Sequence, residues 1–100
     1  MRLFCISLSL LLVVFAGCRK YGDVSTTTYE YAQALYGACS QQDASRLEKA
    51  EQFINDSLAG GDISEAEHGI LMDIVKLAQD EQWEEATQNA RQLMMEQAKS

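Results

Sequence analysis

Proline is absent from this 100-residue chain, and histidine and tryptophan each occur once. Because proline interrupts helices, its absence is typical of helices joined by short turns. Basic residues are scarce after the first 20 positions. Residues 21–100 contain all 15 Asp and Glu but only five of the eight Lys and Arg, which gives a formal charge of −10. A body with this charge has no basic footprint for nucleic acid, and anionic lipid surfaces should repel it.

The sequence also lacks a catalytic constellation. Cys39 and His68 could form a thiol nucleophile and its base, but no orienting residue and no oxyanion loop is recognisable. We therefore expect no enzymatic activity and no cofactor. Cys39 is the only cysteine after Cys18. Two interpretations of it stay open, a small buried residue on a helix or an intermolecular disulfide in an oxidising compartment.

The one long apolar run lies at the N-terminus. A short positive segment, Met1-Arg2, precedes the run from Leu3 to Phe15, and the small residues Ala16-Gly17 follow it. This order is that of a secretory signal. The run is shorter than the roughly 20 residues of a membrane-spanning helix, which disfavours a retained transmembrane anchor. We expect residues 1–17 to be a signal helix that is removed.

The end of this run carries a more specific pattern. Phe15-Ala16-Gly17-Cys18 resembles the lipobox of bacterial lipoproteins, although that family prefers leucine where Phe15 stands. The resemblance implies cleavage between Gly17 and Cys18, diacylation of the Cys18 thiol with chains such as palmitate, and acylation of the new amino group. Two or three acyl chains hold a protein firmly to a membrane. The alternative is an ordinary signal peptide that ends at a cysteine by chance.

The same resemblance implies that the protein is located in the bacterial cell envelope. The protein would be lipid-anchored in the cell membrane or outer membrane and face the periplasm or the exterior. In enterobacteria an aspartate after the lipidated cysteine favours inner-membrane retention, so Arg19 favours the outer membrane. Residues 18–28 would be the lipidated cysteine and a flexible spacer, in which residues 19–28 reach at most about 35 Å. Residues 29–100 would be the acidic helical domain.

Apolar residues of the body recur every three or four positions, which is the period of an amphipathic helix. The pattern predicts an all-α fold, a small bundle of three or four helices at about 28–40, 43–59, 64–79 and 82–98. The first two stripes are nearly in phase, so one long helix is the alternative there. We prefer a break near Asp43, a good N-cap. The expected core residues are Tyr29, Ala32, Leu35, Tyr36, Cys39, Leu47, Ala50, Phe53, Ile54, Leu58, Ala66, Ile70, Leu71, Ile74, Leu77, Ala78, Trp83, Ala86, Ala90, Leu93 and Met94.

Specific residues indicate two of the expected turns between helices. Gly60-Gly61 ends the second helix, and Ser64 with Glu67 forms a capping box that starts the third. On a straight helix, the apolar stripe from Trp83 onward would point roughly 170° away from the preceding stripe. We therefore expect a turn at about residues 80–82 that folds the last two helices into a hairpin.

The segment from Asp56 to Glu67 is a first candidate metal site. Counted as an EF-hand loop, these residues are positions 1 and 12. Calcium also needs oxygen ligands at positions 3 and 5, where Leu58 and Gly60 offer no side-chain oxygen. The simpler interpretation is a corner between two helices, with Ile63 as a buried plug.

His68 and Met72 form a second candidate metal site. They are neighbours one turn apart on a helix face, and Met94-Met95 could join them as soft copper ligands. Methionine more often fills cores, so we expect no metal here. A metal- or ligand-binding lipoprotein that uses either candidate remains the alternative function.

The corner also carries a family pattern. Gly61-x-Ile63-Ser64-x-x-Glu67 resembles the corner of SHOCT domains, short helical oligomerisation modules, although those place an aromatic residue where His68 stands. The resemblance covers about residues 46–72 and implies a possible homo-oligomer. The body as a whole resembles short all-helical bacterial lipoproteins.

Trp83 and the acidic residues are assigned to the core and to the surface, and with the features above they lead to a functional prediction. Trp83 is expected to anchor the core, with partner binding as the alternative. Together the observations predict a membrane-anchored, non-enzymatic small lipoprotein with an interaction, accessory or structural role. Its partners would be the membrane, through lipid on Cys18, and an unidentified envelope protein, but not nucleic acid. The acidic residues expected on a solvated face are Glu48, Glu51, Asp73, Glu84, Glu85 and Glu96.

Overall fold

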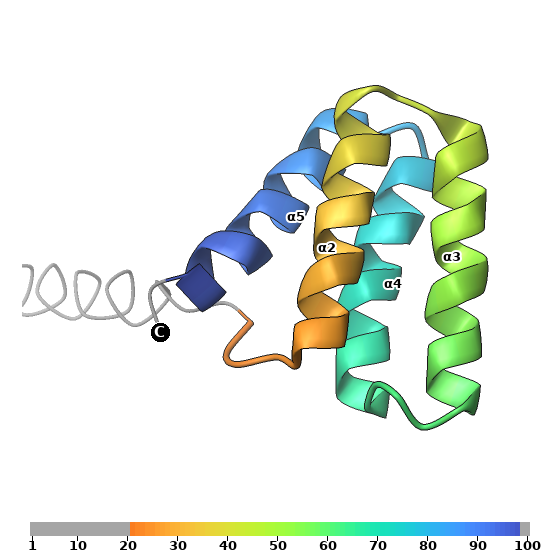
Figure 1. Cartoon of the computed structure of the whole chain (residues 1–100). Helices are drawn as coiled ribbons and strands as arrows, with labels where there is room; N and C mark the ends of the chain where they lie inside the picture. The colour runs from red at the N-terminus through yellow and green to blue at the C-terminus, as the bar shows by residue number, and fades with distance from the viewer. Residues whose placement is uncertain (1–20, 99–100) are drawn as a thin grey trace, which may run out of the picture.

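The computed structural model describes residues 21–98 and confirms an all-α bundle, with no strand in this range. The expected signal helix at 1–17 and the lipidation site Cys18 lie outside the described residues. The first two helices are separate, and Asp43 caps the second of them. The four helices are α2 (Thr26–Ser40), α3 (Ala44–Ala59), α4 (Glu65–Gln79) and α5 (Trp83–Ala98) (Figure 1).

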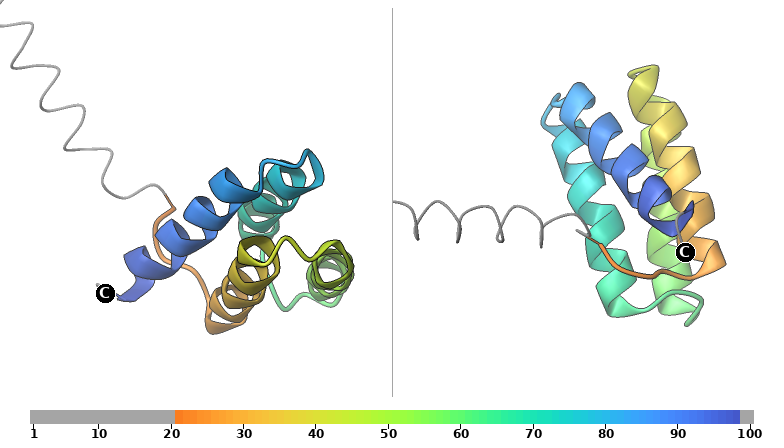
Figure 2. Two further views of the ribbon diagram at one scale, coloured as in Figure 1. Left: turned by 90° about the horizontal axis from the view of Figure 1, so that it is seen from above. Right: turned by 90° about the vertical axis from the view of Figure 1, so that its left-hand side faces the viewer.

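Helices α2 and α4 form the centre of the bundle. They contact each other, and α2 and α4 each contact both α3 and α5, whereas the described parts of α3 and α5 share no contact. Seen from above, α3 lies to one side of the central pair and α5 crosses the other (Figure 2). Helices α2 and α4 run in the same direction, so their N-termini lie at the same end of the bundle (Figure 1).

The core is the layer where the four apolar stripes meet. Helices of this length are marginal alone in water, and burial of the stripe stabilises each of them. Leu35 of α2, Ile54 of α3, Leu71 of α4 and Leu93 of α5 are all fully buried. The other buried apolar residues are Ala32, Ala38, Cys39, Leu47, Ala50, Ile63, Ile74, Val75, Ala78, Ala86 and Ala90.

Several side chains depart from the expected core. Phe53 is 60% exposed, because it precedes the buried Ile54 by one position and so points about 100° away around α3. Ser57 takes a buried place on that stripe, where its hydroxyl lies 2.5 Å from the Tyr31 hydroxyl of α2. Trp83 is half-buried against the core, and both Tyr36 and Ala66 are exposed.

The three corners between the helices share one backbone geometry. In each, a single residue has a positive φ: Gln42 (53°), Gly61 (81°) and Glu81 (62°). The next residue in each case donates its N–H to the carbonyl five positions back, at N···O distances of 2.9, 2.8 and 2.9 Å. This is the Schellman ending of a helix. Only one corner carries the glycine that normally signals it, which is why the other two had to be predicted from stripes and caps.

The adjacent glycines of the α3–α4 corner allow a matched test. We expect Gly61→Ala to lower the free energy of unfolding by about 1 kcal/mol, because a Cβ is strained at positive φ. Gly60 has φ −84°, and the nearest atom to a Cβ there is the Asp56 carbonyl oxygen at 3.4 Å. Gly60→Ala should therefore change stability by less than about 0.5 kcal/mol. Urea unfolding followed by circular dichroism measures both, and equal losses would contradict the strain argument.

Candidate functional site

The Glu67 carboxylate joins two helix N-termini. Its Oε1 accepts the backbone N–H of Ser64 at 2.9 Å, while the Ser64 hydroxyl accepts the N–H of Glu67 at 3.1 Å, which completes the predicted capping box of α4. Its Oε2 accepts the backbone N–H of Ser25, the N-cap of α2, at 2.6 Å. One side chain thus bonds to the N-caps of both central helices.

The electrostatics of Glu67 follow from these contacts. Burial by itself would raise the pKa of this carboxyl group, but the hydrogen bonds that it accepts from Ser25 and Ser64 outweigh burial and lower the pKa to about 2. The positive ends of two helix dipoles also favour a negative charge at this place. Glu67 is therefore ionised throughout the physiological range, and both of its oxygens are occupied by protein donors.

The corner does not assemble the EF-hand arrangement. Glu67, the expected position-12 ligand, is committed to the two N-caps. Asp56 is exposed on the last turn of α3, and its backbone carbonyl accepts the N–H of Gly60 at 2.9 Å as part of the corner. Ile63 is buried as the expected plug. Among residues 21–98 there is no cluster of three or more His, Cys, Asp or Glu side chains that could hold a metal ion.

His68 and Met72 both lie on α4, and the contact that the structure shows for His68 is to α3 rather than to the methionines of α5. The ring Nε2 of His68 lies 2.7 Å from Oδ1 of Asn55, so the ring is directed to α3. Met94 and Met95 belong to α5, which does not contact α3. Met72 packs against the core. The structure therefore uses His68 in a polar contact between α3 and α4.

Residues 21–25, here called the strap, lie along the C-terminal part of α5. The Tyr21 N–H donates to Oε1 of Glu96 at 2.8 Å, and the Val24 N–H donates to Oε1 of Gln97 at 3.1 Å. The Gln97 amide also donates to the Gly22 carbonyl. The side chains of Tyr21 and Val24 pack against the core. The expected spacer 18–28 is thus docked over its described part, and helix α2 begins two residues earlier than predicted.

Glu96 is a buried acidic residue that the sequence pattern placed on the solvated face. It is 5% exposed. Besides Tyr21, it accepts the Gln92 side-chain amide at 2.8 Å. The signal that could have revealed the strap was the apolar pair Tyr21 and Val24 before the Ser25 N-cap. The polar composition around that pair instead favoured a spacer.

A surface groove of about 760 Å³ runs between α3 and the α4–α5 turn. Trp83 lines it together with Glu48, Glu51 and Glu81. Across the groove, the Gln79 side-chain amide of α4 donates to Oε1 of Glu51 of α3 at 2.9 Å. An indole face beside three carboxylates suits a partner segment with a cationic side chain.

Cys39 is buried in the core as a free thiol. Burial raises the pKa of this thiol to about 11. Of the two interpretations left open by the sequence, the buried helix residue matches this environment. A disulfide to another chain would require Cys39 to leave the core.

Comparisons of the chain with protein-family models, curated proteins and solved structures find no match. Within residues 21–98, no helix has both the length and the hydrophobicity that a membrane-spanning segment requires.

The shared carboxylate makes stability depend on pH. The folded pKa of Glu67 is about 2, below its ordinary 4.5, so its contribution is complete above about pH 5 and is lost as the pH falls toward 2. We expect Glu67→Gln to lower the free energy of unfolding by about 1 kcal/mol at pH 7, since the carboxylate is partly exposed. The difference from wild type should shrink to near zero at about pH 2.

Urea unfolding at several pH values measures this difference. Glu65→Gln is the matched control, because Glu65 is an exposed residue of the same helical turn. A difference between wild type and Glu67→Gln that stays constant with pH would contradict the role of the ionised carboxylate.

Thiol labelling tests the environment of Cys39. With Cys5→Ser and Cys18→Ser removing the other two cysteines, we expect Cys39 to react with a maleimide at pH 8 at least about a hundredfold more slowly in the folded protein than in urea. The control is Ser40→Cys in a Cys39→Ala background, because position 40 is exposed and should label at once. Comparable labelling at both positions in the folded state would contradict burial of the thiol.

Proposed function

We propose that this chain is a bacterial lipoprotein whose helical body is held at an envelope membrane by lipid on Cys18 and acts as a non-enzymatic interaction or accessory subunit. The observation that carries the proposal is the ordered N-terminal pattern, in which Met1-Arg2, the apolar run and Phe15-Ala16-Gly17-Cys18 follow one another. Diacylation of Cys18 would make attachment stable, since two chains hold a protein where one does not.

The mechanism would be tethering. Confinement at a membrane raises the effective concentration of the bundle for a partner in the same compartment without any new contact. The groove beside Trp83 supports an interaction role, because it presents an aromatic face and carboxylates at the surface. A basic segment of an envelope protein is the partner chemistry that this groove favours.

The two groups with shifted pKa values also favour a non-enzymatic role. The carboxylate of Glu67 is engaged by two helix N-caps, and the thiol of Cys39 is buried with its pKa raised. Both pKa shifts have structural causes in the fold.

Arg19 after the lipidated position favours the outer membrane as the site of residence.

Expression of the full chain in a bacterial host tests the anchor. We expect the wild type to lack residues 1–17, to carry diacylglycerol on Cys18 by mass spectrometry and to partition into the detergent phase of Triton X-114. Cys18→Ser should lose both the lipid and the partitioning, because its hydroxyl cannot form the thioether. Cys5→Ser is the matched control and should behave as wild type. If Cys18→Ser partitions as the wild type does, the proposal is wrong.

A further inference from the structure

The strap determines where the chain leaves the bundle. Hydrogen bonds from Tyr21 to Glu96 and from Val24 to Gln97 hold it beside the α5 tip, defined here as residues 93–97. Figure 1 shows this end of α5 apart from the lower end of α4, with residues 21–25 running from it to the start of α2. The described chain therefore begins next to the tip of its last helix.

This position shortens the tether. Only Arg19 and Lys20 separate Cys18 from Tyr21 in the sequence. Three Cα-to-Cα steps span at most about 11 Å, whereas an undocked spacer through residue 28 would reach about 35 Å. Lipid on Cys18 would therefore place the α5 tip within about one headgroup layer of the membrane.

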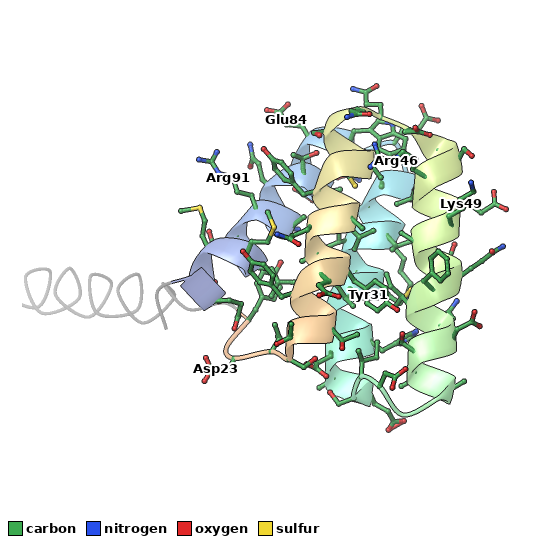
Figure 3. All side chains as sticks on the ribbon, viewed as in Figure 1. Asp23, Tyr31, Arg46, Lys49, Glu84 and Arg91 are labelled. Carbon is green, nitrogen blue, oxygen red and sulfur yellow. The ribbon has the colours of Figure 1, made fainter. Side chains whose placement is uncertain are left out.

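The chemistry of the tip suits such a surface. Met95 is 45% exposed, and Met94 and Tyr21 are half-buried beside it. Among the described residues, the strap and the tip carry one exposed charged residue, Asp23, and Ser25 at the end of the strap contacts Glu67 on the α3–α4 corner, where Asp62 and Glu65 are also exposed. Arg91 lies on α5 before the tip and Asp23 on the strap (Figure 3), while Glu96 is buried. The acidic residues Asp80, Glu81, Glu84 and Glu85 gather at the other end of α5.

We propose that the strap and the α5 tip form a membrane-facing surface, with Met95 at the phospholipid interface and the acidic α4–α5 turn directed away from it. This inference rests on the proposed lipid anchor at Cys18. Flexible thioether side chains adapt to an irregular apolar surface, and a few apolar side chains suffice because the anchor already supplies the affinity.

Tryptophan quenching by brominated lipids tests this orientation. The lipidated protein is reconstituted in phosphatidylethanolamine–phosphatidylglycerol vesicles with dibrominated acyl chains. The native Trp83, the only tryptophan, lies about 18 Å along α5 from position 95 and should not be quenched. In a Trp83→Phe background, Met95→Trp should lose roughly half or more of its fluorescence, because an interfacial indole lies at the depth of the upper acyl chains.

Phe53→Trp in the same background is the matched control. Position 53 is also exposed and apolar, but it lies on α3, away from the strap, and should remain bright. Gln97→Ala removes both side-chain contacts of Gln97 to the strap and should reduce quenching at position 95. Gln88→Ala, an exposed change on the same helix, should leave quenching unaltered.

The outcomes separate the orientation from the anchor. Equal quenching at positions 53, 83 and 95, or none at 95, overturns the membrane-facing surface. Protection of position 95 from both brominated lipid and aqueous acrylamide also overturns it, because a protein would then cover the tip. If mass spectrometry finds Cys18 unacylated, the proposed function fails. Coupling the mature chain through Cys18 to a maleimide phospholipid then still tests the geometry by the same quenching, since the buried Cys39 does not compete.

Discussion

The Glu67 carboxylate joins the N-termini of the two central helices of the bundle. Helices α2 and α4 run in parallel at the centre, so the positive ends of two helix dipoles lie at the same end of the molecule. Parallel dipoles repel each other, and the first N–H groups of both helices need acceptors. A single anion that accepts from Ser25 and Ser64 meets both needs. The pKa of Glu67 is low because the ionised carboxylate accepts these hydrogen bonds.

The strap extends this constraint to the fourth helix. Ser25 is held at the base of α4, and four residues earlier Tyr21 is held by Glu96 of α5. The chain between them bridges the N-terminus of one helix and the C-terminal part of another. Because α5 diverges from α4 toward its end, the apolar side chains of Tyr21 and Val24 cover core that α5 alone would leave open. Tyr21 and Val24 of the strap thus pack against the core beside α5.

The elements with periodic sequence could be predicted, and the elements without it could not. The four helices and three corners followed from apolar stripes, the Ser64 capping box and the Asp43 N-cap. The strap could not be foreseen, because five residues in an extended segment show no helical period, and their partners on α5 are 73 and 75 positions away in the sequence. Glu96 was placed in solvent for the same reason, since the sequence pattern gave no sign that the docked Tyr21 N–H would reach this carboxylate.

The docked strap also changes how the acidic charge of the body bears on the proposed anchor. A flexible spacer would let a domain of charge −10 keep its distance from anionic lipid, whereas a tether of about 11 Å does not. At physiological ionic strength, charges are screened beyond about 8 Å. The orientation of the bundle then matters more than its net charge. With the α5 tip toward the lipid, the carboxylates of the α4–α5 turn lie more than one screening length away. With a tether this short, turning the α5 tip toward the lipid keeps the carboxylates of Asp80, Glu81, Glu84 and Glu85 at the far end of α5.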